Sequence, residues 1–129
     1  MNKTTTIVAA TFIIMAAAGC NSKTTENSQA SPRTVAETIF NSAKSGNYDG
    51  LAALIDTEAD NDSKMIAQAV VDKKIQEEFK TYFKSGKVVG DPVINGDKAS
   101  VNILFGPDGD KEETFEMVKR DGRWYLQSF

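Results

Sequence analysis

Apolar residues in residues 32–83 recur every three or four positions, which is the period of an amphipathic helix. The Ser31-Pro32 pair predicts the start of a first helix, because serine caps helices well and proline suits a first turn. Thr34 and Glu37 offer an alternative capping box. The predicted apolar side consists of Val35, Ala36, Ile39, Phe40 and Ala43. The run Ser45-Gly46-Asn47 predicts the end of this helix.

Two further helices are predicted before residue 84. Asp49 is placed to cap a short second helix at residues 50–55, and a long third helix is predicted over residues 63–83. The apolar side of the third helix holds Ile66, Val70, Ile75, Phe79 and Phe83. Its other side carries Lys73, Lys74, Glu77, Glu78, Lys80 and Lys84. Charges of alternating sign indicate a face in contact with solvent.

From residue 87 onward the hydrophobic period changes to two, which is typical of β-strands. Turns are predicted at Asn95-Gly96, at residues 106–109 and at Asp121-Gly122, so the strands form hairpins in series. The inward positions are Ala99, Val101, Ile103, Phe105, Phe115, Met117, Trp124 and Leu126. Helices followed by strands predict an α+β domain, with the N-terminal helices packed on one face of a four-stranded antiparallel meander sheet.

The first twenty residues have the layout of a signal peptide. Lys3 is followed by an uncharged apolar run at residues 7–18, whose 12 residues are too few to span a bilayer. The run ends in Ala17-Ala18-Gly19 directly before Cys20, a pattern that resembles a bacterial lipobox. Ala17 stands where that family usually has leucine.

The lipobox resemblance implies that Cys20 is diacylglyceryl-modified, becomes the mature N-terminus and is then acylated, for example with palmitate. The alternatives are an ordinary secretory signal with a free Cys20, or a buried cysteine. The expected organisation is a lipoprotein signal peptide at 1–19, an acylated cysteine and flexible tether at 20–31, and an α+β domain at 32–129. Asn21 follows the cysteine in place of the aspartate linked to inner-membrane retention, which favours an outer-membrane address in a bacterial cell envelope.

Composition excludes several kinds of chemistry in this 129-residue chain. It has no histidine and one cysteine, so it has no imidazole for catalysis or zinc binding and no internal disulfide. Loss of residues 1–19 removes Lys3 and no acid, which takes the basic count from 15 to 14 against 18 acids and the net charge from −3 to −4. An acidic chain lacks the basic surface that binds nucleic acid, so no nucleic-acid partner is expected.

The order of the predicted elements, together with Gly46-Asn47-Tyr48-Asp49 and Gly122-x-Trp124-x-Leu126, resembles the nuclear transport factor 2-like superfamily. More narrowly, the chain is similar to small bacterial lipoprotein domains grouped with lumazine-binding-like proteins. The resemblance implies a curved sheet wrapped into a cystatin-like cone. Family members include isomerases, dehydratases, ligand binders and non-catalytic partner modules, so the fold by itself assigns no chemistry.

An isomerase-type site would need a carboxylate base in an apolar pocket and a hydroxyl to hold the oxyanion. Tyr48, Tyr82 and Tyr125 each supply a hydroxyl, but no acid is predicted inside the sheet, and Glu116 is expected to point away from the core. No catalytic residue is therefore assigned. The enzyme nonetheless remains an alternative interpretation.

The acidic run at residues 56–62 lacks the glycine and glutamate of a calcium loop, because Asn61 and Ala67 occupy those positions. It is interpreted as a solvated loop whose last acids cap the third helix. A second acidic group, Asp108, Asp110, Glu112 and Glu113, is expected at a hairpin tip. No metal and no cofactor is expected.

The function predicted from the sequence is non-enzymatic binding by a lipid-anchored domain; a purely structural lipoprotein is the further alternative. A pocket for a small apolar ligand would be lined by Phe40, Phe79, Phe83, Phe105, Phe115 and Trp124. An interface for a homodimer or another envelope protein would use Leu104, Val118, Tyr125 and Phe129, expected on the exposed face of the sheet. The identity of the ligand or partner does not follow from the sequence.

Overall fold

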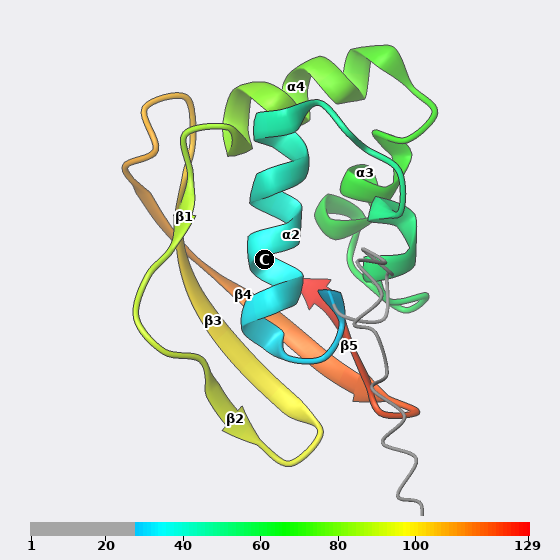
Figure 1. The fold of residues 1–129 in the computed structure, drawn as a ribbon, viewed down its shortest axis with the longest axis vertical. Helices are drawn as coiled ribbons and strands as arrows, with labels where there is room; N and C mark the ends of the chain where they lie inside the picture. Colours follow the sequence, from blue (N-terminus) through cyan, green and yellow to red (C-terminus); the bar gives the residue numbers. More distant parts are fainter. Residues whose placement is uncertain (1–27) are drawn as a thin grey trace, which may run out of the picture.

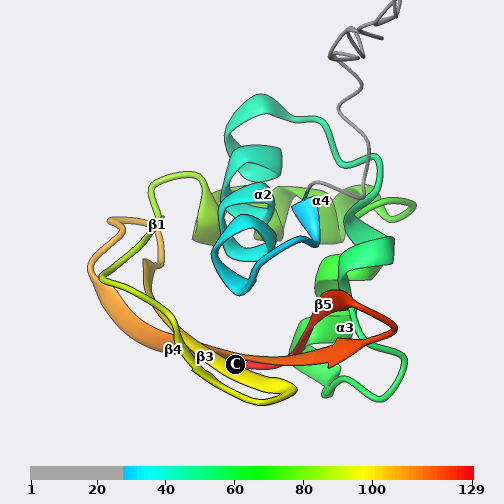
Figure 2. The same ribbon diagram turned by 60° about the horizontal axis from the view of Figure 1, so that its bottom comes forward.

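The structure, a computed structural model, describes residues 28–129. Helices cover one face of an antiparallel sheet that curves beneath them (Figures 1 and 2). The elements are α2 (Pro32–Ser45), η1 (Leu51–Leu54), α3 (Asn61–Gln68), α4 (Lys73–Phe83), β1 (Lys87–Val88), β2 (Val93–Asn95), β3 (Lys98–Phe105), β4 (Lys111–Arg120) and β5 (Arg123–Ser128). The α+β class and the order of helices before strands are confirmed. Within residues 28–129, no helix has both the length and the apolar character needed to cross a bilayer.

The first helix begins and ends where the sequence predicts. The Ser31 side chain accepts from the backbone N–H of Thr34, the Thr34 hydroxyl oxygen accepts from the Ser31 N–H, and Pro32 occupies the first turn. These bonds satisfy backbone donors that a helix start leaves free. Gly46 ends the helix in the left-handed conformation, at φ 75°. The capping box therefore uses Ser31 with Thr34, and Glu37 takes no part in it.

The predicted second and third helices differ from the structure. Asp49 does not cap the second helix: η1 is a single 3-10 turn that begins after Gly50 without a side-chain cap. The predicted third helix is divided into α3 and α4, because Asp72 starts a new helix by accepting from the N–H groups of Lys74 and Ile75. Asp60 caps α3 in the same way, through Ser63. The two caps allow α3 and α4 to take different directions.

The sheet follows the order β1-β3-β4-β5, and β2 also pairs with β3. The predicted meander is present, but its first strand is in two pieces, which gives five strands where four were expected. Pro92 has no N–H to contribute to the ladder, and the chain between β1 and β2 is instead held by Arg33 of α2, which donates to the Gly90 carbonyl and to Asp91.

The predicted turn at Asp121-Gly122 is confirmed by positive φ at both residues. The first hairpin turns one residue later than predicted, because Asn95 pairs with Lys98 and leaves residues 96 and 97 in the turn.

The other edge of the sheet is covered by the segment between η1 and α3. Ile55 bridges Leu126 in parallel, and the N–H groups of Asp56 and Asp60 donate to the carbonyls of Leu126 and Gln127. A covered edge offers no free ladder to another chain.

Gln29 is buried against β5, although the sequence placed it in the tether. Its backbone carbonyl accepts from the Trp124 N–H at 3.0 Å, and its side-chain amide donates to the carbonyls of Ala53 and Trp124. A polar side chain is buried at low cost when its hydrogen bonds are made. The folded part thus includes Gln29, and the boundary expected at residue 32 lies too late. The predicted signal peptide, the predicted lipidation site at Cys20 and the part of the predicted tether through residue 27 lie outside the described residues.

A bulge in β5 changes which face the last residues occupy. Met117 of β4 pairs with Leu126, but the preceding residue, Glu116, pairs with Ser128. Gln127 is therefore an extra residue in β5. A one-residue insertion reverses the alternation of side chains beyond it. Phe129 therefore joins the concave face, where its ring centroid lies 5.4 Å from that of Phe115.

The hairpin between β3 and β4 is in close van der Waals contact with the segment that follows α4. A Cβ atom added at Gly109 would lie 2.2 Å from the carbonyl oxygen of Ser85, whereas one added at Gly46 would meet nothing within 4 Å. Both glycines have positive φ, so alanine adds backbone strain at either position.

We expect Gly109→Ala to lower the free energy of unfolding by about 2–4 kcal/mol, the sum of backbone strain and a steric clash. The matched control Gly46→Ala introduces the strain alone and should cost about 1 kcal/mol. Urea unfolding monitored by circular dichroism measures both values. Equal losses in the two variants would contradict the close packing of the hairpin on Ser85.

Candidate ligand-binding site

A hollow of about 220 Å³ opens between α3, α4 and one end of the sheet. We call it the aromatic hollow. Its wall from α3 consists of Asp62, Met65 and Ile66; its wall from α4 consists of Ile75, Glu78, Phe79, Tyr82 and Phe83; and the sheet contributes Phe105 and Phe129. β3 and β5 both pair antiparallel with β4, so they run in the same direction, and the rings of Phe105 in β3 and Phe129 after β5 reach each other across the concave face.

The helical period of α4 presents five side chains to the hollow. Their positions are spaced by three, one, three and one residues, which places them along one face of a helix. Asp72 fixes where that helix starts, and therefore which residues face inward. The end of α4 is held by the β3–β4 hairpin, whose Gly106 N–H donates to the Tyr82 carbonyl at 2.6 Å.

Aromatic rings form the floor of the hollow. The centroid of Phe83 lies 5.7 Å from that of Phe105 and 5.8 Å from that of Phe129, and the rings of Phe105 and Phe129 are 6.2 Å apart. Rings at these separations are in favourable edge and tilted contact. The floor is consequently a continuous apolar surface made of rings in mutual contact.

The rim of the hollow is more polar than its floor. Tyr82 is 43% exposed, and Asp62 and Glu78 are exposed carboxylates from the two helices. Neither carboxylate has a hydrogen bond or an ion pair to any residue in the described part of the chain. The lining thus combines a large apolar surface with two acids that are available to a ligand.

The six residues predicted to line a pocket are divided by the structure. Phe79, Phe83 and Phe105 line the hollow. Phe40 and Phe115 are buried beneath it in the core, with their rings stacked at a centroid distance of 5.9 Å. Trp124 is buried near Gln29, and the Lys119 ammonium lies 5.9 Å from the centroid of the Trp124 ring. The sequence did not single out Met65, Ile66, Ile75 and Phe129 as lining residues. Ile66 and Ile75 were detectable from the apolar helix pattern, but Phe129 was not, because the bulge decides its side.

The predicted interface residues do not form one exposed face. Phe129 is on the concave side, and Val118 is only 5% exposed. Val118 lies between Lys98 and Tyr125 on the neighbouring strands, and the Lys98 ammonium reaches across β4 to the Gln127 side chain at 3.3 Å, so the lysine stem covers the valine. Leu104 and Tyr125 are half-buried. Two of the four residues predicted to form an exposed apolar patch, Val118 and Phe129, therefore do not contribute to one on the convex face.

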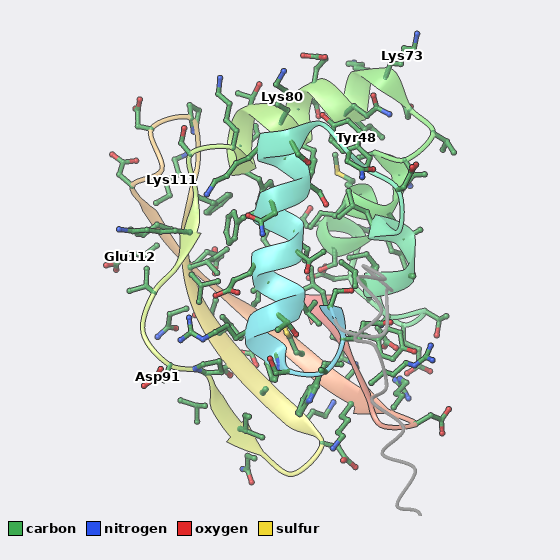
Figure 3. All side chains as sticks on the ribbon, viewed as in Figure 1. Tyr48, Lys73, Lys80, Asp91, Lys111 and Glu112 are labelled. Atoms are coloured by element: carbon green, nitrogen blue, oxygen red, sulfur yellow. The ribbon has the colours of Figure 1, made fainter. Side chains whose placement is uncertain are left out.

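The three tyrosines occupy separate places. Tyr82 is in the hollow, Tyr48 packs its ring edge on Phe79 at 5.9 Å, and Tyr125 lies opposite Val118 on the convex side. Figure 3 shows Tyr48 beside α4, with Lys73 and Lys80 pointing outward from that helix. Glu116 points away from the core, as expected, and accepts from the Ser100 hydroxyl at 2.8 Å.

Asp56 is a buried acid that the sequence placed in a solvated loop. Its side chain is 2% exposed, and its carboxylate accepts two hydrogen bonds from Arg120, from Nε at 2.8 Å and from Nη2 at 3.2 Å. The Arg120 side-chain bonds hold the pKa of Asp56 below its usual 3.8, although burial acts in the opposite direction. Asp56 is absent from the lining of the hollow, so it is a structural anchor for the loop on β4.

No family model matches the chain, and a search of curated proteins found no match. Among solved structures the chain is similar to a Campylobacter jejuni protein with the provisional name NTF2-like transpeptidase, with a TM-score of 0.49 and 19% identity over 76% of this chain and 97% of that chain. It is also similar to the protein Rd1NTF2_05 in a substituted form, with a TM-score of 0.49 and 14% identity over 74% of this chain and 91% of that chain. These values carry no argument about activity.

We expect Asp56→Asn to lower the free energy of unfolding by about 1–3 kcal/mol at neutral pH, because it removes a buried charged hydrogen-bond acceptor. A lowered pKa in the folded state means that ionised Asp56 stabilises the fold above pH 3.8, and that this contribution is lost as pH falls through the lowered value. The difference between wild type and variant should therefore shrink below about pH 4. Urea unfolding at a series of pH values measures it.

The matched control is Glu58→Gln, which removes a carboxylate that contacts the same arginine but is exposed. Its effect should be much smaller at every pH. A loss for Asp56→Asn that stays constant from neutral pH to pH 2 would contradict the assignment.

Proposed function

We propose that this chain is a lipid-anchored protein of the bacterial envelope whose domain binds a small apolar molecule in the aromatic hollow. The observation that carries the binding proposal is the hollow itself, an open apolar site whose floor consists of the contacting rings of Phe83, Phe105 and Phe129. Preformed concave apolar surfaces with a few polar groups at the rim are the usual form of ligand sites.

Size limits the ligand. An apolar cavity of about 150 Å³ holds a benzene ring, and drug-sized molecules occupy sites of about 300–1,000 Å³. The hollow, at about 220 Å³, lies between these values. It therefore suits one fused ring system or a short alkyl chain, with the remainder of a larger molecule outside the mouth.

Anchoring is proposed from the sequence alone. An apolar run of 12 residues that ends in small residues before Cys20, followed by a polar segment, supports lipid attachment at that cysteine. Two or more acyl chains hold a protein at a membrane stably, since each buried methylene contributes about 0.8 kcal/mol. The binding domain would then stay near the membrane surface. Of the two membranes of a diderm envelope, Asn21 favours the outer one.

An isomerase or dehydratase has no specific observation in its favour. Such an enzyme needs a general base near the substrate, with a pKa raised by an apolar environment. The buried Asp56 has a lowered pKa and lies away from the hollow, while Asp62 and Glu78 are exposed at its rim. We therefore propose binding without chemistry.

Binding is tested by filling the hollow. A neutral naphthyl alcohol should bind the mature chain, residues 20–129, carrying Cys20→Ala, which has neither the apolar run at residues 7–18 nor the thiol for acylation. Met65 lines the hollow and is 40% exposed, so Met65→Trp is expected to obstruct the site and weaken binding at least about tenfold, the loss of one buried apolar group. Isothermal titration calorimetry measures both affinities.

The matched control is Val71→Trp, in the turn after α3, which adds the same side chain at a position that is 84% exposed and outside the lining. It should leave the affinity unchanged. Absence of binding to wild type, or equal losses in the two variants, would refute the ligand site.

Anchoring is tested by metabolic labelling with an alkyne fatty acid in a bacterial host. Cys20→Ala should abolish the label, because the thiol is the attachment point. Ser22→Ala, two residues away, should retain it. Labelling that survives the loss of Cys20 would exclude the lipoprotein assignment.

A further inference from the structure

We propose that the ligand of the aromatic hollow is a cation, an amine joined to an apolar ring or short chain. This inference rests on the proposed binding function and adds the chemical class of the ligand. It is carried by the charge of the rim set against the apolar floor.

The two charged side chains of the lining are both acids. Asp62 comes from the first turn of α3 and Glu78 from the middle of α4, so the two helices place negative charge on two sides of the mouth. The lining contains no lysine and no arginine. Both helices of the described lining therefore contribute negative charge and no positive charge.

These acids are not engaged elsewhere. The ion pairs found among residues 28–129 involve Arg33 and Arg120, and both arginines are outside the lining. Lys74 precedes Glu78 by one helical turn, but no ion pair joins them within the described part of the chain. Lys73 and Lys80 point outward from α4 (Figure 3). A carboxylate accepts hydrogen bonds only, so its best partner is a donor with a positive charge.

The aromatic residues favour the same class of ligand. The exposed ring of Tyr82 lines the α4 wall, and a cation near an aromatic face is stabilised by about 0.5–1 kcal/mol at an exposed site. An anion would meet two carboxylates and aromatic rings without a compensating base. An ammonium group at the mouth, with the apolar body of the ligand on the floor, satisfies both parts of the site.

Three probes that share one ring system separate charge from hydrophobicity. Naphthylmethylamine is a cation, naphthylmethanol is neutral and naphthylacetate is an anion at pH 7. We expect the amine to bind residues 20–129 carrying Cys20→Ala about threefold to tenfold more tightly than the alcohol, the effect of two exposed ion pairs, and the anion to bind more weakly than either. Added salt should reduce the preference for the amine and leave the alcohol unchanged.

Variants identify the acids responsible. Asp62→Asn combined with Glu78→Gln should reduce the ratio of amine affinity to alcohol affinity to about one. Glu77→Gln, which neutralises the neighbouring α4 position outside the lining, should keep the preference. Isothermal titration calorimetry reads all three probes against each variant.

The outcomes distinguish this inference from the function on which it rests. Binding of the alcohol without preference for the amine overturns the cation assignment and leaves the ligand site intact. A preference that survives in the double variant also overturns it, since the charge would then act from elsewhere. Failure of all three probes to bind refutes the proposed function, and this inference falls with it.

Discussion

The contacts of Phe83 hold the helical layer and the sheet together and also form the candidate site. Its ring lies within 6.3 Å of the rings of Phe40, Phe79, Phe105, Phe115 and Phe129, which come from α2, α4, β3, β4 and the residue after β5. On one side these rings fill the core, and on the other they are the floor of the aromatic hollow. Any change that moves α4 along its axis would therefore alter the core and the hollow together.

The elements that could be predicted are those encoded by local signals. The start of α2 follows from Ser31-Pro32, and the last hairpin follows from Asp121-Gly122, because each signal depends on a few adjacent residues. The division between α3 and α4 had a local signal too, since Asp72 is a good cap, but a continuous apolar pattern concealed it. The capping propensity of Asp72 favours a helix start, whereas the apolar periodicity favours one continuous helix; in the structure Asp72 starts a new helix.

The candidate site was only partly predictable because it depends on contacts between distant residues. Helical period identified Phe79 and Phe83, and strand alternation identified Phe105. No property of residues 123–129 alone reports the bulge that moves Phe129 to the concave face, nor the lysine stem that covers Val118. Gln29 is a comparable case. The polar composition around it predicts a tether, and only its hydrogen bonds to the distant residues Trp124 and Ala53 show that it belongs to the fold.

The attachment of Gln29 has a mechanical consequence for a protein anchored as we propose. A pull between the membrane and the domain would reach Gln29 before it reaches α2, and the bonds of Gln29 to Trp124 would transmit load to β5. β5 lies between β4 and the segment at Ile55, so the tension would be shared across the sheet rather than applied to the end of α2. The N-terminal end of α2 would thus bear little of the force that a membrane anchor applies to the domain.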